Sequence, residues 1–471
     1  MSIISLYFAV RQIQGEMDMN FTKSKARDMT TGTPMRLILA FALPLFLGDL
    51  FQMCYNLADA AIVGRVLGTE ALAAVGAAAP GYSLFTMVIS GFANGASVVV
   101  AQAFGSGDEE YLRKAYSTSI LVLMLSGIVV TVFSLFLVRP ILLLLHTPEN
   151  VLEASRLYLQ WMCLGVLATC LYNGMASILR AVGDSATPLI ALILASILNI
   201  ILDLVFVMGF GLGVSGAAIA TILSQLLSGC LCVYFVYRNI PPFRLRFREY
   251  RIYGSILREV IRVGFPAALS MAVVIFSVML IQRAVNAYGS TVVAAFTAAS
   301  RAENVYLCLS FSMGMATGIF TAQNAGAKKI DRVLAGLRTG IRITLIYHVL
   351  MGIVIFVMAP YLIRLFTASA EVISISTEIV RISACFAPVL GVLFVFQNFL
   401  RNVSDVSPTI LMSTAEIVCR GFLPFQLSGR FGYHGIWWAT PVGWSLSLLI
   451  GIVRYRSGRW KTVMQRHSEQ T

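Results

Sequence analysis

Apolar runs separated by short polar stretches recur along nearly the whole chain. Each run is long enough to cross the roughly 30 Å hydrocarbon core of a bilayer as a helix. The pattern therefore predicts an all-α integral membrane protein with twelve transmembrane helices. Their expected ranges are 37–63, 70–101, 115–138, 157–179, 188–209, 213–237, 256–283, 291–322, 335–360, 372–400, 408–427 and 433–453.

Polar residues interrupt the first run at helical spacing. Asp49, Gln52, Asn56 and Asp59 recur every three or four positions, which places them on one face of a helix. An ionised Asp at mid-bilayer costs about 2.5 to 3.5 kcal/mol on insertion scales, so such residues usually face a bundle interior or a wet cavity. This stripe predicts a functional site on the first transmembrane helix.

Two later runs carry polar faces of their own, in the fifth and sixth predicted helices. The first face has Ser196, Asn199 and Asp203, and the second has Thr221, Ser224, Gln225 and Ser228. If the three faces converge, their carboxylate, amide and hydroxyl oxygens form a site suited to Na⁺. The same groups would also suit an Asp pair that shares and releases a proton.

The chain repeats itself once. LRAVGDSATP at 179–188 and LRNVSDVSP at 400–408 share a Leu-Arg pair and an Asp, separated by about 220 residues. The same interval separates Gln102 from Gln323 and Gly105 from Gly326. Six helices followed by six more, both copies starting on the same side, predict two pseudo-symmetric six-helix bundles with substrate expected between them.

The repeat does not extend to the acidic chemistry. Positions in the second half that correspond to Asp59 and Asp203 hold Leu280 and Leu423. The intramembrane charges there come as neighbours, Arg301 with Glu303, Glu378 with Arg381, and Glu416 with Arg420. A spacing of four favours an internal salt bridge for the last pair. Ion coupling is therefore predicted in the N-terminal half alone.

The formal net charge of +13 follows the membrane topology. Of the 35 Lys and Arg residues, 26 fall in loops on the side of the N-terminus, six fall on the other side and three lie within predicted helices. This asymmetry is the positive-inside rule, so both termini are predicted to be cytoplasmic. The basic charge needs no nucleic-acid partner.

The same reading predicts the domain organisation. We expect a cytoplasmic tail at 1–36, an N-lobe at 37–237, a basic cytoplasmic linker at 238–255, a C-lobe at 256–453 and a second tail at 454–471. The apolar stretch 3–10 lacks a basic flank, so no cleavable signal sequence is expected. All eight cysteines lie in membrane segments without a CxxC pair and are interpreted as small apolar residues.

Several of these segments together resemble one family. The run LPLFLGDLFQMCYNLADAAIVGRVLG at 43–68, the LRAVGD and LRNVSD loops, LNIILD at 198–203 and GVSGAAIAT at 213–221 are similar to the multidrug and toxic compound extrusion (MATE) family, in its prokaryotic DinF-like branch. The likeness covers about residues 30 to 456. It implies a V-shaped pair of bundles in a bacterial plasma membrane, which exports cationic amphipathic drugs in exchange for Na⁺ or H⁺.

The resemblance also implies roles for single residues. The family's cation site falls on Asp59, Asn199, Asp203 and Thr221, and its substrate contacts on Gln52, Tyr55, Asn56 and Gln225. Pro44 matches a proline at which some members bend the first helix. Asp49 is an additional acid, interpreted either as a second titratable group or as a cavity-lining residue for cationic substrates. Val274 and Phe394 stand where one branch carries C-lobe acids, so no C-lobe cation site is expected.

The resemblance and the residues together predict a secondary antiporter, monomeric, with no cofactor besides its coupling ion. No GxxxxGK[ST] sequence is present to supply ATP drive. The main alternative is a lipid or lipid-linked oligosaccharide flippase, but such proteins have basic cavities, and this stripe is acidic. The four histidines are scattered and form no catalytic motif, which disfavours an enzyme. A receptor would need a soluble sensor domain, and no loop is long enough to form one.

Overall fold

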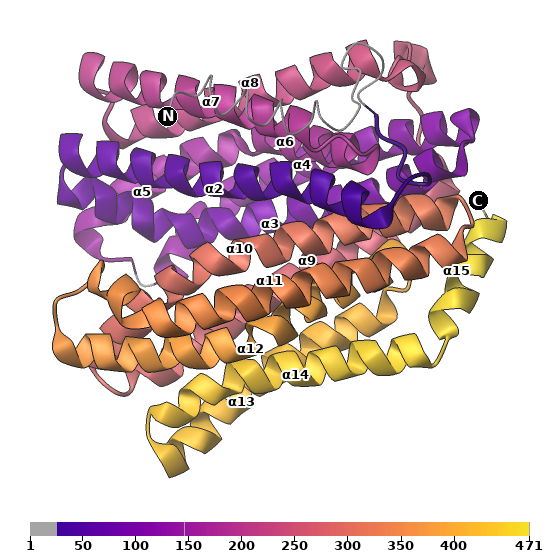
Figure 1. Ribbon diagram of the computed structural model, residues 1–471. Helices are drawn as coiled ribbons and strands as arrows, with labels where there is room; N and C mark the ends of the chain where they lie inside the picture. The colour runs from indigo at the N-terminus through magenta and orange to yellow at the C-terminus, as the bar shows by residue number, and fades with distance from the viewer. Residues whose placement is uncertain (1–25, 146, 471) are drawn as a thin grey trace.

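Long helices run side by side through the whole molecule, as the apolar runs predict (Figure 1). The computed structural model describes residues 26–145 and 147–470. The helices of the first half are α2 (Pro34–Val66), α3 (Thr69–Ser106), α4 (Glu109–Leu144), α5 (Glu149–Leu164), α6 (Val166–Ala181), α7 (Ala186–Asp203) and α8 (Gly213–Asn239). Those of the second half are α9 (Gly254–Asn286), α10 (Ser290–Gly326), α11 (Ile330–Arg364), α12 (Ala370–Asn402), α13 (Ser407–Phe431), α14 (His434–Arg456) and α15 (Arg459–Gln470).

These helices match the predicted transmembrane segments. Among the described residues, nine helices are long and apolar enough to cross a membrane, or up to eleven if each of two bent pairs is one span. One bent pair is α5 with α6, which meet at Gly165 with a 47° bend and fill the predicted fourth span. The other is α10, bent by 42° between Asn304 and Leu307. The remaining helix, α13, has the length of a span but carries Glu416 and Arg420.

The helices form two bundles, α2 to α8 in one and α9 to α14 in the other (Figure 1). The basic linker between them contains two short 3₁₀ helices, Pro241–Phe243 and Phe247–Glu249. It lies against α4, where Phe243 stacks on Tyr116 at 4.2 Å between ring centroids and Arg113 pairs with Glu249 at 3.1 Å.

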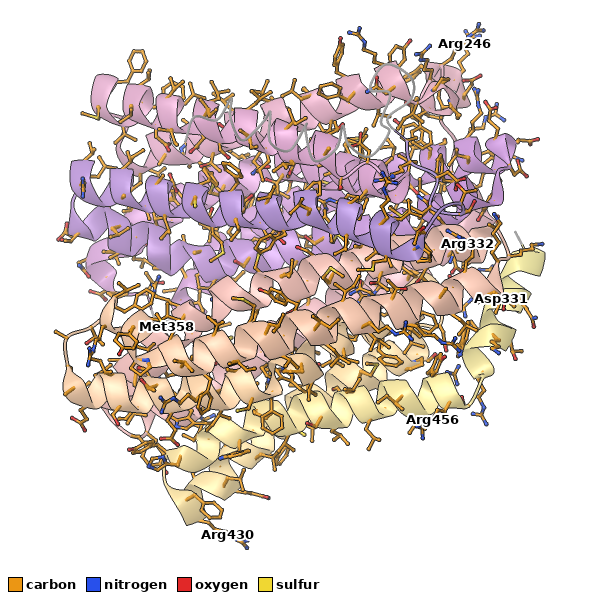
Figure 2. The ribbon with its side chains drawn as sticks, in the orientation of Figure 1. Arg246, Asp331, Arg332, Met358, Arg430 and Arg456 are labelled. Carbon is orange, nitrogen blue, oxygen red and sulfur yellow. The ribbon has the colours of Figure 1, made fainter. Side chains whose placement is uncertain are left out.

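Basic loops gather at one end of the molecule. Arg246, Arg332 and Arg456 lie at this end, together with Asp331, whereas Met358 and Arg430 lie at the other (Figure 2). We call the first the terminal end, because residues 26–33 and α15 lie there; it is the end predicted to be cytoplasmic. The predicted C-terminal tail contains α15, whose Trp460 is buried and lies edge-on to Phe399 at 5.1 Å.

The two bundles meet at the terminal end through repeat-related backbone contacts. Gly105 of α3 lies so close to α10 that an added Cβ would stand 1.9 Å from the carbonyl oxygen of Gln323. Gly326 of α10 is placed in the same way against the carbonyl oxygen of Gln102, also at 1.9 Å. Small residues allow such approach in a membrane protein, where packing rather than hydrophobic exclusion drives helix association.

The segment before α2 binds across both bundles at the terminal end. The backbone N–H of Arg27 donates to the carbonyl of Val182 at 2.8 Å, and that of Met29 donates to Gln323 Oε1 at 2.9 Å. Arg332 donates to the carbonyl oxygens of Met29 and Gly32 at 3.0 and 2.9 Å. The described part of the predicted N-terminal tail is therefore held between the bundles.

The glycine contact predicts a measurable opening of the terminal end. In Gly105→Val the added side chain meets the Gln323 carbonyl, so the bundles must separate there. With the native cysteines replaced, we expect Ala325→Cys, which is buried beside this contact, to react with maleimide at least several times faster when Gly105→Val is present. Gly76→Val on the same helix meets no atom within 4 Å and should leave the rate unchanged. Equal labelling rates in all three backgrounds would contradict the prediction.

Candidate functional site

Two acids from different helices meet inside the first bundle. Asp59 lies on α2, and Asp203 is the last residue of α7, where the helix widens into a π-helical turn at 204–209. Their carboxyl groups are close enough to interact electrostatically with each other. Two carboxylates this close repel each other when both are ionised, so a proton or a cation between them would stabilise the pair. The structure thus brings together the two acids that the polar faces predict to converge.

Asn199 and Thr221 complete the cluster. Asn199 and Asp203 are fully buried and lie one turn apart on α7, while Thr221 is 9% exposed on α8. The Asn199 amide makes its full set of bonds when its nitrogen faces Asp203. It then donates to Asp203 Oδ2 at 3.0 Å, and its oxygen accepts from the Thr221 backbone N–H at 3.3 Å. The four predicted cation-site residues therefore lie together, contributed by α2, α7 and α8.

Each acid keeps one oxygen without a hydrogen-bond partner. Asp59 Oδ1 and Asp203 Oδ1 are both buried, and neither has a donor among the described residues. A buried polar oxygen without a partner is costly, so such atoms call for a proton, an ion or a water. The cluster has the oxygen donors that a proton or a small hard cation would use.

Tyrosines surround the acid pair, and one of them was not predicted. Tyr55, one turn before Asp59, lies close to Thr221 and to the acid pair. Tyr158 of α5 is buried and close enough to Asp59 and Asp203 to interact with both electrostatically. Sequence analysis missed Tyr158 because no ionisable residue lies three or four positions from it on α5. Only the packing of α5 against α8 shows that it faces the site.

Asp49 belongs to a separate place, between the bundles. It precedes Asp59 by ten residues, which is about 15 Å along a helix. It lines a cavity of about 240 Å³ whose wall also includes Gln52, Arg180 and Phe311. Ser312 of α10 donates to Asp49 Oδ2 at 2.9 Å, so this acid links the first bundle to the second. Ser312 could not be predicted, because no other polar residue lies three or four positions from it on α10. Nothing in the sequence indicates that this side chain faces Asp49.

The predicted substrate residues divide between these two places. Gln52 lines the inter-bundle cavity and donates to Asn56, which is exposed, at 3.3 Å. Tyr55 lies beside the acid pair. Gln225 Oε1 is buried without a hydrogen-bond partner on α8, one turn after Thr221. The structure therefore does not gather these residues around a single cavity.

Pro44 lies within α2, which continues as one helix from Pro34 to Val66. It is buried and lines the same cavity as Asp49. Since proline has no N–H, the carbonyl of Ala40 lacks its usual helical donor. The hinge assignment stays a prediction, but this missing bond lies beside the inter-bundle cavity.

The second bundle carries a paired charge in place of an acid pair. Arg420 lies 3.9 Å from Glu416, and Gln397 donates to Glu416 at 3.3 Å. Both charged side chains are nine-tenths buried. The predicted internal salt bridge is confirmed. In the repeated loops, Asp184 accepts from the backbone N–H of Thr187 at 2.9 Å, whereas Asp405 binds Arg454 at 2.7 Å. Both loop acids are therefore structural.

Comparisons with known proteins place the fold and the site in a family. The MatE family model matches residues 44–205 and again 266–424, once for each half of the repeat. The chain belongs to the MATE family. Members of this family are transporters, so this chain is a multi-pass membrane transporter rather than an enzyme.

Curated relatives span nearly the whole chain. It is 29% identical to the probable multidrug resistance protein YpnP of Bacillus subtilis, over 93% of this chain and 98% of the relative. It is 30% identical to YoeA, a second probable multidrug resistance protein of Bacillus subtilis, over 89% and 93%. It is 25% identical to an FAD transporter of Shewanella oneidensis, over 89% and 93%.

Among solved structures, the chain resembles the outward-facing conformation of a multidrug resistance MATE transporter. The TM-score is 0.86 at 23% identity, covering 94% of this chain and all of that one. At this level of identity the likeness concerns the fold. It confirms the MATE arrangement of two six-helix bundles described above.

The hydrogen bond between the bundles predicts an energetic coupling in this MATE transporter. Removing the donor in Ser312→Ala should lower the free energy of unfolding, and much of that loss should vanish once Asp49→Ala has removed the acceptor. We expect a coupling energy of about 1 kcal/mol or more in a double-mutant cycle, measured by denaturant unfolding in mild detergent.

A matched cycle controls this measurement. Ser270→Ala removes a hydroxyl that, among the described residues, bonds the Pro266 carbonyl of its own helix α9, so its effect should add to that of Asp49→Ala within about 0.5 kcal/mol. Additive effects for Ser312 as well would mean that the two bundles gain nothing from this contact.

Proposed function

We propose that this MATE transporter is a secondary antiporter that exports cationic amphipathic small molecules from a bacterial cell in exchange for H⁺ or Na⁺ by alternating access. The coupling ion binds at Asp59, Asn199, Asp203 and Thr221. The observation that carries the proposal is the proximity of the Asp59 and Asp203 carboxyl groups, each of which keeps a buried oxygen without a partner among the described residues.

The acid pair supplies a chemistry for coupling. Held together, the two carboxyls retain a proton; a sodium ion would instead use their free oxygens together with the Asn199 and Thr221 oxygens. One positive charge moving inward across 100 mV supplies about 2.3 kcal/mol, and the concentration gradient of the ion adds to this. Binding of the cation then weakens binding of the cargo, and binding of the cargo weakens that of the cation, through a coupling free energy between their sites.

The inter-bundle cavity supports a small-molecule cargo. It combines the Asp49 carboxylate, the Gln52 amide and the aromatic ring of Phe311, which suit a cation with an apolar body. Under this proposal Asp49 contacts cargo, and the acid pair some 15 Å away along α2 carries the ion. The names of YpnP and YoeA as probable multidrug resistance proteins support the same class of cargo.

The central test is ion-driven efflux from proteoliposomes. We expect purified protein to move ethidium against its gradient when a proton or a sodium gradient is imposed alone, which identifies the ion. Asp59→Asn and Asp203→Asn each remove a charge with little change in shape and should lower coupled efflux at least about tenfold.

Asp108→Asn serves as the matched control, because Asp108 only caps the start of α4 by accepting from Tyr111 N–H. Its efflux should equal that of wild type. Wild-type efflux by correctly inserted Asp59→Asn and Asp203→Asn proteins would reject the coupling site.

A flavin nucleotide is a second candidate cargo. Arg180 lines the same cavity as Asp49 and offers a guanidinium to an anionic group, and one relative is named an FAD transporter. Exchange of ethidium and of FAD can be measured in the same liposomes. A cationic cargo predicts that Asp49→Asn impairs ethidium export while Arg180→Gln does not. Selective FAD transport that fails in Arg180→Gln would favour the flavin nucleotide.

A further inference from the structure

A groove of substantial size lies on the second bundle alone. Its volume is about 840 Å³, and its lining residues come from α11, α12, α14 and the loop between α11 and α12. No residue of α2 to α8 takes part, so it is separate from the inter-bundle cavity. Apolar walls formed by Phe356, Ile382, Phe386 and Trp438 surround two arginines, Arg364 and Arg381.

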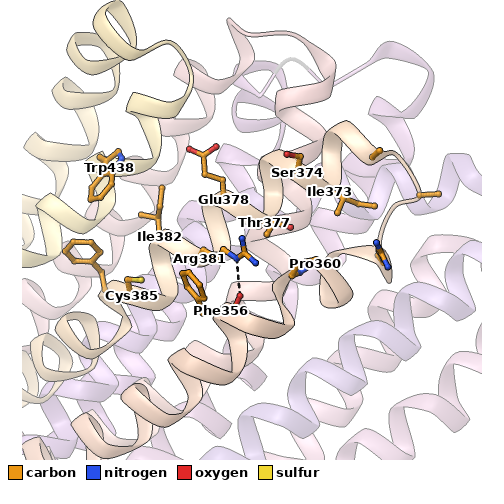
Figure 3. A pocket seen from close by; sticks show the side chains of 14 residues that line it. Phe356, Pro360, Ile373, Ser374, Thr377, Glu378, Arg381, Ile382, Cys385 and Trp438 are labelled. Carbon is orange, nitrogen blue, oxygen red and sulfur yellow. Dashed lines mark hydrogen bonds between the residues drawn. The ribbon is translucent and has the colours of Figure 1, made fainter.

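Arg381 reaches across this groove from α12 to α11 (Figure 3). Its Nε donates to the carbonyl oxygen of Phe356 at 3.1 Å, and its guanidinium lies 5.0 Å from the centre of the Phe356 ring. That carbonyl is available because Pro360, four residues later, has no N–H to donate to it. The bond uses one of five guanidinium donors, so the terminal NH₂ groups remain for another acceptor.

Neither arginine has an acidic partner. Among the described residues, no carboxylate lies within 4.0 Å of Arg364 or Arg381, and the recorded contact of Arg364 is with the Tyr361 ring at 5.6 Å. Glu378 also lines the groove, but it points toward α14, where His434 Nδ1 lies 2.7 Å from its carboxylate (Figure 3). The groove therefore presents two unpaired positive charges.

The depth of Arg381 suits a membrane interface. The 33 residues of α12 are about 50 Å long, so each end projects about 10 Å beyond a 30 Å hydrocarbon core. Arg381 follows Ala370 by eleven residues, about 16 Å, which places its Cα about 6 Å inside that core. Helical side chains lean toward the helix N-terminus, here the end away from the termini, so the guanidinium reaches the boundary.

We propose that this groove binds the headgroup phosphate of an anionic phospholipid in the leaflet away from the terminal end, with Arg364 and Arg381 as its ligands. An acyl chain lies along the apolar wall, where Phe356 and Trp438 are 42% and 46% exposed. The two unpaired guanidiniums select negative charge, and the apolar wall selects a lipid over a free phosphate ion. The lipid phosphate thereby neutralises an arginine that has no acidic partner within a membrane span.

The test compares lipids on the full-length purified chain. Native mass spectrometry would measure binding of dioleoyl phosphatidylglycerol and dioleoyl phosphatidylcholine to wild type, Arg381→Gln, Arg364→Gln and the double variant. We expect wild type to prefer phosphatidylglycerol, and each substitution to weaken that lipid about fivefold while leaving phosphatidylcholine unchanged. Arg430→Gln, at the same end but on the tip of α13, should retain the preference (Figure 2).

Three results would overturn the proposal. An unchanged preference in the double variant would show that the arginines do not select the lipid. An equal loss in Arg430→Gln would show general charge attraction. Displacement of phosphatidylglycerol by millimolar inorganic phosphate would assign the site to the free ion.

A second measurement does not depend on the arginine variants folding. Brominated phosphatidylglycerol should quench the tryptophan fluorescence of the otherwise unaltered chain more strongly than brominated phosphatidylcholine, because Trp438 lines the groove. Trp438→Phe should remove most of that excess quenching. The same excess in Trp438→Phe and wild type would place the lipid elsewhere and contradict the proposal.

Discussion

The two bundles meet in a close backbone contact that only glycine permits. Gly105 lies against Gln323 and Gly326 against Gln102, at equivalent positions of the repeat. Gln323 also accepts from Met29, so the segment before α2 is tied to the same place. The bundles are held together at the terminal end, and the cavity that Asp49 lines lies farther from that end than this contact. An exporter of this design must break these contacts to expose its cavity at the terminal end.

The cost of charge in a bilayer explains how the two bundles differ. In the first bundle, Asp59 and Asp203 are close together, and no basic partner is recorded for them among the described residues; a proton or cation shared between them would lower the cost of burying both. In the second, Glu416 has Arg420 and Gln397 beside it. A site that loads and releases an ion must leave some of its oxygens without permanent hydrogen-bond or ion-pair partners. In a structural ion pair, both charged groups have partners. Only the first arrangement suits an exchange cycle.

The repeat keeps backbone geometry more closely than side-chain chemistry. Gly183 and Ser404 occupy the same place in the two repeated loops, and both have positive φ, 85° and 60°. The acid that follows each of these residues has a different partner. Asp184 caps the next helix, whereas Asp405 binds Arg454. The family model likewise matches both halves.

The sequence by itself determined the helices, the twofold repeat and the polar faces, because membrane spans need long apolar runs and buried acids stand out within them. It also marked Asp59, Asn199, Asp203 and Thr221, each on the polar face of its own helix, although whether the three faces meet was left to the tertiary structure. Only the tertiary structure decided that Asp49 faces Ser312 of the other bundle, that Tyr158 lies beside the acid pair, and that Arg381 meets the carbonyl left free by Pro360. Each of these contacts joins helices far apart in the chain, and single-helix periodicity carries no information about which helix a face will meet.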